Sequence, residues 1–314
     1  MPQRLPQHLK NKVAVVTGAG RGIGRAEALA LAAEGARVVV NDYGGEKDGA
    51  GSSPSPADQV VEEIRRAGGI AIASHDTVAT WEGAERIIRG ALDQFERLDI
   101  LVNNAGILRD RMVYNMTEPE WDDVVKVHLY GTFFCTHQAC RWFRQQRSGR
   151  IINTSSSAGL GVAGMANYSA VKEGIVGFTR SVARDMGRYG VTCNAIRPRA
   201  GTRMTLNPEM QASVARARAM GISGGVLSRE LEHERLKPEE VAPFVAYLAT
   251  DEAAGINGCV FFVAGGEIAL YPEPAPVKTL YKEGMWTLEE LVEAVPRTLS
   301  AGLVNPAPPA GPGP

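Results

Sequence analysis

The 314-residue sequence predicts an α/β fold, in which one domain is built on a doubly wound parallel sheet of seven strands and carries a C-terminal extension. Two observations carry this prediction. Apolar runs rich in β-branched residues alternate with stretches of helical period along most of the chain. These runs also lack the apolar/polar alternation of half-exposed strands, which indicates strands that are buried on both faces of a sheet.

Each predicted helix lies between two predicted strands, so right-handed crossovers are expected to place helices on both faces of the sheet. A capping box, Thr117-Glu118-Pro119-Glu120, fixes the start of the fourth helix. The strands are predicted at Val13–Thr17, Arg37–Asn41, Gly69–Ser74, Ile100–Asn103, Arg150–Thr154, Val191–Ile196 and Cys259–Val263. The helices are predicted at Gly24–Glu34, Ala57–Ala67, Glu82–Phe95, Glu118–Phe143, Tyr168–Tyr189 and Pro238–Thr250.

Two segments depart from the alternating pattern. Gly44–Pro56 is rich in Gly, Ser and Pro and is expected to form a flexible surface insertion. From Pro272 onward the pattern ends, which divides the chain into a domain at 1–271 and an arm and tail at 272–314. A second capping box at Thr287–Glu290 predicts a short helix in the arm. The Pro-rich tail cannot pack and is expected to be disordered.

Composition excludes several classes of function. The formal net charge is -1 and the pI is about 6.6, so neither nucleic acid nor an anionic membrane is an expected partner. No apolar run approaches the ~20 residues of a membrane span, and Met1–Lys12 has no apolar core of a signal peptide, so a cytoplasmic location is expected. Four dispersed cysteines predict reduced thiols and no metal site: Cys135, Cys140, Cys193 and Cys259.

A glycine-rich turn follows the first strand and opens the first helix. Its sequence is Thr17-Gly18-Ala19-Gly20-Arg21-Gly22-Ile23-Gly24. Glycines let the backbone approach a pyrophosphate, which the amides at the helix start then bind. Because such turns are common, it is the position between strand and helix that predicts a dinucleotide site.

Asp42 ends the second strand, 18 residues after Gly24, where a carboxylate can bind the ribose hydroxyls of NAD and repel the 2′-phosphate of NADP. It could instead begin a turn, and Arg21 could partner a phosphate, but the sequence favours NAD. Asp76, after the third strand, could accept a hydrogen bond from adenine or cap a helix.

The candidate chemical group begins with Tyr168 and Lys172, which are four residues apart and share one face of a helix. A neighbouring ammonium is expected to lower the pKa of a phenol, ordinarily about 10, and make it a general acid and base near neutrality. A strand that ends in Thr154, Ser155 and Ser156 should bring hydroxyls to the same edge of the sheet.

Taken together, T-G-x-x-x-G-x-G, N-N-A-G, S and Y-x-x-x-K occur in this order over residues 13–172, and in this the chain resembles the short-chain dehydrogenase/reductase family. The resemblance implies a Rossmann-type fold, a nicotinamide cofactor contacted also by Asn104, Ala105 and Gly106, and a homodimer or homotetramer packed through the fourth and fifth helices. It implies that Tyr168 exchanges a proton with the substrate oxygen, while Lys172 holds the nicotinamide ribose.

The same resemblance leaves the serine ambiguous. The usual spacing of 13 residues before the tyrosine selects Ser155, whereas aligning the strand selects Ser156. We favour Ser156, because a strand tolerates a deletion less well than a loop. The family commonly has an asparagine where this chain has His128. A structural histidine is the commoner case, but its place suggests a proton-relay role.

Longer segments are similar to the dehydrogenase domains of the peroxisomal multifunctional enzymes type 2, over residues 11–265. They are VVNDYGG, NNAGILRDR, VHLYGTF, ANYSAVK, CNAIRPRAGTRMT and LKPEEVAP. This resemblance implies oxidation of (3R)-hydroxyacyl-CoA, or of 17β-hydroxysteroids, with NAD. Four arginines expected near the substrate could meet CoA phosphates or simply form surface ion pairs: Arg109, Arg111, Arg199 and Arg203.

Two other functions remain open. An NADPH-dependent 3-oxoacyl reductase would share the catalytic residues, and only Asp42 argues against it. A non-catalytic dinucleotide-binding sensor would share the fold, although the intact tyrosine, lysine and serine argue against that. The predicted helix near Thr287–Val295 could cover the active site of a neighbouring subunit.

Overall fold

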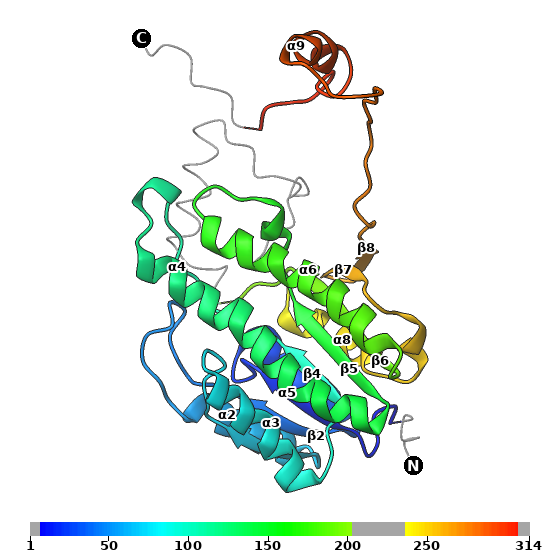
Figure 1. Ribbon diagram of the computed structural model, residues 1–314. Coiled ribbons are helices and arrows are strands. Elements are labelled where there is room, and N and C mark those ends of the chain that lie inside the picture. The colour runs from blue at the N-terminus through cyan, green and yellow to red at the C-terminus, as the bar shows by residue number, and fades with distance from the viewer. Residues whose placement is uncertain (1–6, 203–235, 307–314) are drawn as a thin grey trace.

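The structure is a computed structural model that describes residues 7–202 and 236–306. These residues form one α/β unit around a single sheet (Figure 1). The sheet has eight strands in the order β3-β2-β1-β4-β5-β6-β7-β8. Seven are parallel, as predicted. They are β1 (Val13–Thr17), β2 (Arg37–Asn41), β3 (Ile70–Ser74), β4 (Ile100–Asn103), β5 (Gly149–Thr154), β6 (Val191–Pro198) and β7 (Val260–Ala264).

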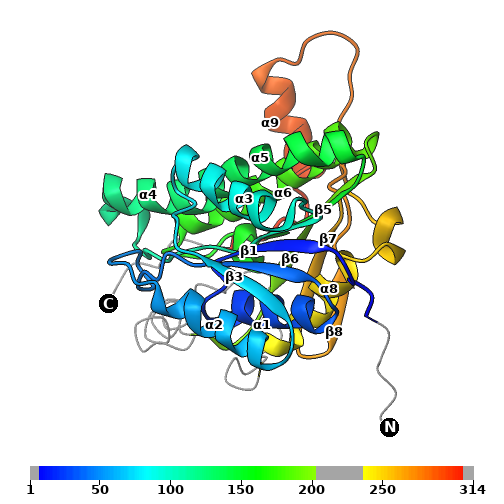
Figure 2. The same ribbon diagram turned by 90° about the horizontal axis from the view of Figure 1, so that it is seen from below.

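Helices cover both faces of the sheet (Figure 2). One face carries α1 (Gly22–Ala33), α2 (Ser55–Arg66) and α8 (Ala242–Leu248). The other carries α3 (Trp81–Phe95), α5 (Gly131–Gln146) and α6 (Ala166–Gly187). Each layer closes a separate apolar cluster against the sheet, so the strands are buried on both faces as their uninterrupted apolar runs predict.

The predicted fourth helix is continuous but not uniform. It consists of α4 (Glu118–Val124), a π-helical turn η2 (Val125–Tyr130) and α5. The capping box at its start is present, since the side chains of Thr117 and Glu120 each accept from the other residue's amide. The π turn inserts an extra residue into the helix at His128, which rotates that side chain inward.

The eighth strand, β8 (Glu267–Leu270), was not predicted, and the expected count of seven is therefore one too few. It pairs antiparallel with β7 across a two-residue Gly265-Gly266 turn, where both glycines have positive φ values of 54° and 83°. All four of its residues are exposed, although three of them are apolar: Ile268, Ala269 and Leu270. The Gly-Gly pair was the available signal, because it is typical of a hairpin turn.

The C-terminal arm begins after β8. It runs extended to α9 (Leu288–Arg297), which starts at the predicted capping box and stands away from the sheet (Figure 1). None of the α9 residues is buried. Residues 307–314, and with them most of the Pro-rich tail, lie outside the described part. Within the described ranges, no helix is long and apolar enough to cross a membrane.

Short 3-10 turns complete the fold. They are η1 (Val113–Asn115), η3 (Ser157–Leu160), η5 (Pro238–Glu240) and η6 (Glu252–Gly255).

Candidate active site

The glycine-rich turn after β1 is held rigidly against the loop that follows β4. Asn104 donates from Nδ2 to the carbonyl oxygens of Thr17 and Gly18, both at 3.0 Å. Gly18 has a φ of 65°, and a Cβ there would come within 2.7 Å of Ala105 Cα. Position 18 therefore requires glycine, and the N-N-A-G motif holds the turn in place through the hydrogen bonds of Asn104.

The start of α1 suits a bound anion. Arg21 is its N-cap residue but makes no side-chain capping bond, and the first turn contains no acidic residue, as far as the described chain shows. The amides of Gly22 and Ile23 thus open the helix with the positive end of its dipole. These features fit the pyrophosphate of a nicotinamide dinucleotide.

Asp42 lies directly after β2 and faces the turn. Its Oδ2 accepts from the amide of Gly20 at 2.8 Å, and its Oδ1 accepts from the amide of Gly44 at 2.6 Å. Arg21 donates to the carbonyl of Gly45 at 3.3 Å. Two backbone amides therefore fix the orientation of the carboxylate beside the turn, and its contact with a ribose stays a prediction.

Asp76 does not cap α3, which was one of the two roles considered for it from sequence. Its carboxylate forms an ion pair with Arg86 at 2.6 Å, while Thr80 is the N-cap of α3. The capping interpretation is therefore wrong. The adenine contact stays a prediction.

The structure brings Ser156, Tyr168 and Lys172 together at the ends of β5 and α6. The Ser156 side chain lies close enough to the Tyr168 hydroxyl to oppose the rise of its pKa. Lys172 is 3% exposed, its Nζ donates to the carbonyl of Thr154 at 2.6 Å, and it lies 5.4 Å from the centre of the Tyr168 ring. The sequence prediction that these groups converge agrees with this geometry.

The neighbouring Ser155 points the other way. It is 1% exposed and donates from Oγ to the carbonyl of Lys172 at 2.7 Å. Side chains alternate at the end of an extended strand, so only one of two adjacent serines can face the tyrosine. The geometry favours Ser156 for the catalytic role and gives Ser155 the task of joining β5 to α6.

The expected lowering of the tyrosine pKa does not appear in the chain by itself. Burial raises the pKa of Tyr168 to about 12, and the Ser156 side chain only partly opposes this. Burial also lowers the pKa of Lys172 to about 7. The prediction considered the attraction between the two groups, but desolvation of both is the larger effect here.

His128 is 1% exposed and lies behind Tyr168, with its ring at 88° to the phenol and 5.3 Å between the centroids. Its Nε2 lies 2.8 Å from the carbonyl oxygen and 3.0 Å from the amide nitrogen of Ile107, so each neutral tautomer finds a partner there. Burial, followed by the charge of Lys172, holds its pKa well below the usual range. Nδ1 has no partner among the described residues.

The position of the His128 ring also explains why residue 106 is glycine. A Cβ at Gly106 would come within 2.4 Å of the imidazole Cε1, so the last residue of N-N-A-G makes room for this ring. These contacts establish a packing role, and the relay role stays a prediction.

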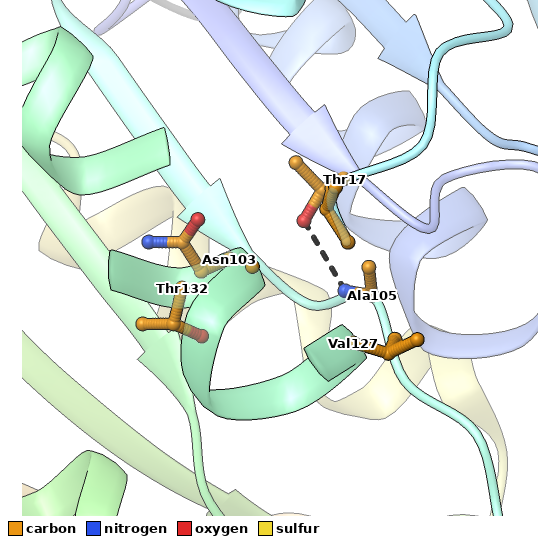
Figure 3. A pocket seen from close by; sticks show the side chains of 7 residues that line it. Thr17, Asn103, Ala105, Val127 and Thr132 are labelled. Carbon is orange, nitrogen blue, oxygen red and sulfur yellow. Dashed lines mark hydrogen bonds between the residues drawn. The ribbon is translucent and has the colours of Figure 1, made fainter. Parts of the chain in front are cut away.

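Figure 3 shows a small crevice under the N-N-A-G loop. The Thr17 hydroxyl accepts from the amide of Ala105 at 3.2 Å, which ties the end of β1 to this loop. Beside it, Asn103 donates from Nδ2 to Thr136 and to Asn153. The wall of the crevice is formed by Thr17, Val78, Asn103, Ala105, Val127, Gly131 and Thr132.

The arginines proposed for CoA phosphates mostly have partners within the chain. Arg109 pairs with Asp123 at 3.0 Å, and Arg111 pairs with Glu120 at 2.7 Å. Burial lowers the pKa of Arg199. Arg203 lies outside the described residues. The ion-pair interpretation therefore fits Arg109 and Arg111.

Two buried polar residues near the site were not predicted. Asn167, fully buried, donates to the carbonyls of Arg109 and Glu120 and accepts from the amide of Tyr168, so it anchors the start of α6 beside the candidate catalytic tyrosine. Arg197 is 3% exposed at the end of β6. A lone arginine in an apolar strand was the available signal for Arg197, whereas no pattern distinguishes Asn167.

The family model for short chain dehydrogenases matches residues 12–213. Mouse peroxisomal multifunctional enzyme type 2 is 44% identical over 264 residues, which cover 84% of this chain but 33% of that longer protein. The hydroxyacyl-CoA dehydrogenase ChsB1 of Mycobacterium tuberculosis is 41% identical over 90% of this chain and 87% of its own length.

A third relative has the opposite named activity. The 3-oxoacyl-(acyl-carrier-protein) reductase of Synechocystis is 43% identical over 83% of this chain and 98% of its own length. Among solved structures, a short chain dehydrogenase from Mycobacterium avium superposes with a TM-score of 0.78 at 42% identity, covering 97% of this chain and 98% of that one.

Proposed function

The chain belongs to the short-chain dehydrogenase family, and on that premise we propose an NAD-dependent oxidoreductase that transfers a hydride between nicotinamide and a secondary alcohol or ketone. The proposed substrate class is (3R)-hydroxyacyl-CoA, with 17β-hydroxysteroids as the second candidate. One observation carries the proposal of catalysis: Ser156, Tyr168 and Lys172 meet beside the braced glycine turn.

Each residue of the proposed site has its own role in the reaction. Bound dinucleotide supplies or accepts the hydride. Tyr168 exchanges its hydroxyl proton with the substrate oxygen, and Ser156 holds that oxygen by a hydrogen bond. Lys172 Nζ lies 5.4 Å from the centre of the phenol ring, where the charged form of the lysine favours the phenolate. Ser155 and Asn167 keep the strand end and the helix start in register for these three groups.

Asp42 supports NAD as the cofactor. Its carboxylate is fixed by two amides at the end of β2, so it cannot turn away from a 2′-phosphate without losing both bonds. Repulsion between two fixed anions would disfavour NADP.

The acyl-CoA substrate class is supported by the relative named hydroxyacyl-CoA dehydrogenase, which aligns over most of both chains. The reductase relative supports the alternative, NADPH-dependent reduction of 3-oxoacyl groups, and the shared catalytic residues do not separate the two. We also propose a homodimer or homotetramer packed through α5 and α6.

A direct assay tests the function. Purified protein is incubated with a (3R)-3-hydroxyacyl-CoA, a (3S) isomer or a 17β-hydroxysteroid, each with NAD or NADP, and the absorbance of the reduced dinucleotide is followed. We expect turnover of the (3R) thioester with NAD. Efficient steroid turnover without thioester turnover would move the proposal to its second candidate, and faster reaction with NADPH and a 3-oxoacyl substrate would replace it.

Tyr168→Phe is the control for catalysis. Loss of the hydroxyl should reduce kcat by ~10²–10⁴-fold, while NADH still binds. If the variant turned over normally, Tyr168 would not be the catalytic acid and base. If no substrate reacted with the native protein while it still bound dinucleotide, the chain would be a sensor.

A further inference from the structure

Arg197 is the one charged residue of the buried strand β6. It is the seventh residue of β6, its side chain is 4% exposed, and both terminal nitrogens of its guanidinium are used. Nε, which is also buried, has no partner among the described residues. Burying a charge is unfavourable unless its bonds are satisfied, so this arginine needs an explanation.

Its contacts converge on the active site. Nη1 donates to the carbonyl of Ser156 at 2.8 Å, and Nη2 donates to Glu173, the residue after Lys172, at 2.8 Å. A planar guanidinium can hold two acceptors at a fixed angle, which a lysine cannot do. Arg197 therefore fixes the backbone of the candidate catalytic serine relative to the helix that carries the tyrosine and lysine.

A third contact reaches the base of the C-terminal arm. The guanidinium carbon lies 4.9 Å from the centre of the Tyr271 ring, and Tyr271 continues the pairing past β8 by donating its amide to Val260. That ring also packs on the small cluster formed by Val176, Ala195 and Val260. The arm thus begins on a residue that closes over the arginine.

The loop after Ser156 is fitted to this ion pair. A Cβ at Gly159 would come within 2.8 Å of the Glu173 carboxylate and 3.2 Å of Arg197 Nη1. A side chain at position 159 would therefore displace the Glu173 carboxylate from its place beside the guanidinium. Ser156 itself caps this turn, since its Oγ accepts from the amide of Ala158 at 3.1 Å.

We propose that Arg197 is a positioning residue that holds Ser156 in its catalytic orientation and is itself held by Glu173 and Tyr271. The proposal rests on the proposed function, because it assigns Arg197 an effect that passes through Ser156. A merely structural ion pair would stabilise the fold without acting on that serine.

A double-mutant cycle separates these two cases. Arg197→Met should lower kcat for the best substrate by about ten- to a hundredfold, with KM changed less, because the hydroxyl is displaced from the reacting oxygen. In a Ser156→Ala background the same substitution should change kcat by less than about threefold, since the group through which it acts is gone. An equal factor in both backgrounds, or no effect in either, would overturn the proposal.

Arg150 supplies a matched control. It is also a buried strand arginine, 7% exposed, whose guanidinium donates to the carbonyls of Gly149 and Thr250 far from Ser156. Arg150→Met should lower stability without a kcat effect that depends on Ser156. Arg197→Lys should not restore kcat, whereas Glu173→Gln, which keeps an acceptor, should retain most of it.

Hydrogen exchange gives a readout that needs no turnover. Loss of the Arg197 bond should speed exchange of the Ala158 amide by about tenfold or more, because its acceptor Ser156 is released. Arg150→Met should leave exchange of this amide unchanged.

If Arg197→Met does not fold, Tyr271→Leu tests the link from Tyr271 through Arg197 to Ser156. Unchanged exchange of the Ala158 amide together with unchanged kcat in that variant would reject the proposal. Absence of any substrate turnover in the native chain would reject the proposed function but leave the exchange result readable.

Discussion

At the scale of single residues, substitutions of the two adjacent serines after β5 are expected to have different effects, one on kcat and the other on stability. Ser156→Ala removes the side-chain hydroxyl close to that of Tyr168 and should reduce kcat by ~10²-fold. Ser155→Ala removes a buried bond to the Lys172 carbonyl and should lower the free energy of unfolding by ~1–2 kcal/mol while kcat falls little. Steady-state kinetics and urea unfolding of both variants check this, and the reverse pattern would assign catalysis to Ser155.

Glu27 is a buried titratable group that the proposed mechanism does not use. It lies in α1, fully buried, and neither carboxylate oxygen has a partner within the described chain. Burial raises its pKa from the ordinary 4.5 to about 8. Between these values the folded protein keeps a proton that the unfolded chain releases, so stability should fall as the pH rises from about 4.5 to about 8.

The Glu27→Gln variant should lack this part of the pH dependence. Relative to it, the native chain should lose on the order of 3 kcal/mol of unfolding free energy between pH 5 and pH 8. Urea unfolding at both pH values measures the difference. Glu62→Gln, on the exposed side of α2, is the control and should follow the native curve. Parallel curves for Glu27→Gln and the native chain would show that the carboxyl is not buried in solution.

These residues show where sequence reasoning succeeds and where it ends. The spacing of Tyr168 and Lys172 placed them on one face, because helical period is a local property. In the chain by itself the pKa of Tyr168 is raised and not lowered, because desolvation depends on every element that packs around the pair; the lowered pKa of the cofactor-bound site stays a prediction. Glu27 had no signal at all: a glutamate in a helix usually faces water, and only the tertiary packing of α1 buries it.

At the scale of elements, the loop 44–53 has more structure than its Gly/Ser/Pro composition predicted. The carbonyl of Lys47 accepts from the amide of Leu108 at 2.9 Å, and that of Asp48 accepts from Arg109 Nε at 2.9 Å. Arg109 in turn pairs with Asp123 at the end of α4. The loop after β2 is thereby tied to the loop after β4.

Arg109→Ala should release this tie. We expect amide exchange in residues 44–53 to rise by about tenfold or more, and the Kd for NAD to rise severalfold, because Gly44 and Asp42 share a hydrogen bond. Arg111→Ala is the matched control, since Arg111 pairs with Glu120 outside the loop. Equal exchange in the two variants would show that Arg109 does not hold the loop.

The element boundaries predicted from the spacing of apolar residues lie close to the observed ones, and for strands β1, β2 and β4 they are identical. Long apolar runs are local evidence of burial on both faces, so tertiary context changes them little. β8 was missed because its apolar run is only a few residues long and an exposed edge strand carries no signal of burial. The π turn at His128 was not predicted, because one extra residue in a helix does not visibly change the 3.6-residue period of the sequence.

At the scale of the whole molecule, the described chain leaves large apolar side chains exposed in several places, and two of these bear on assembly. One is an aromatic surface on α3 and α5, where Trp81, Phe133 and Trp142 are 37%, 38% and 45% exposed. The other is the arm, where Met285 and Leu288 are 90% and 72% exposed. Contiguous apolar surface of this kind marks an interface, and for the arm we expect the occupant to be a second copy of the chain.

Truncation after Tyr271 tests the arm. No residue of α9 is buried, so the shortened chain should keep its fold and its NADH affinity. If the arm covers the active site of a neighbour, KM for the acyl substrate should rise by about tenfold while kcat is retained, because contacts made equally to substrate and transition state are lost. Leu288→Asp combined with Val292→Asp in the full-length chain should reproduce the KM change, since it alters only the apolar face of α9. Unchanged KM in both forms, with unchanged molecular mass in solution, would show that the arm binds neither the substrate nor a second subunit.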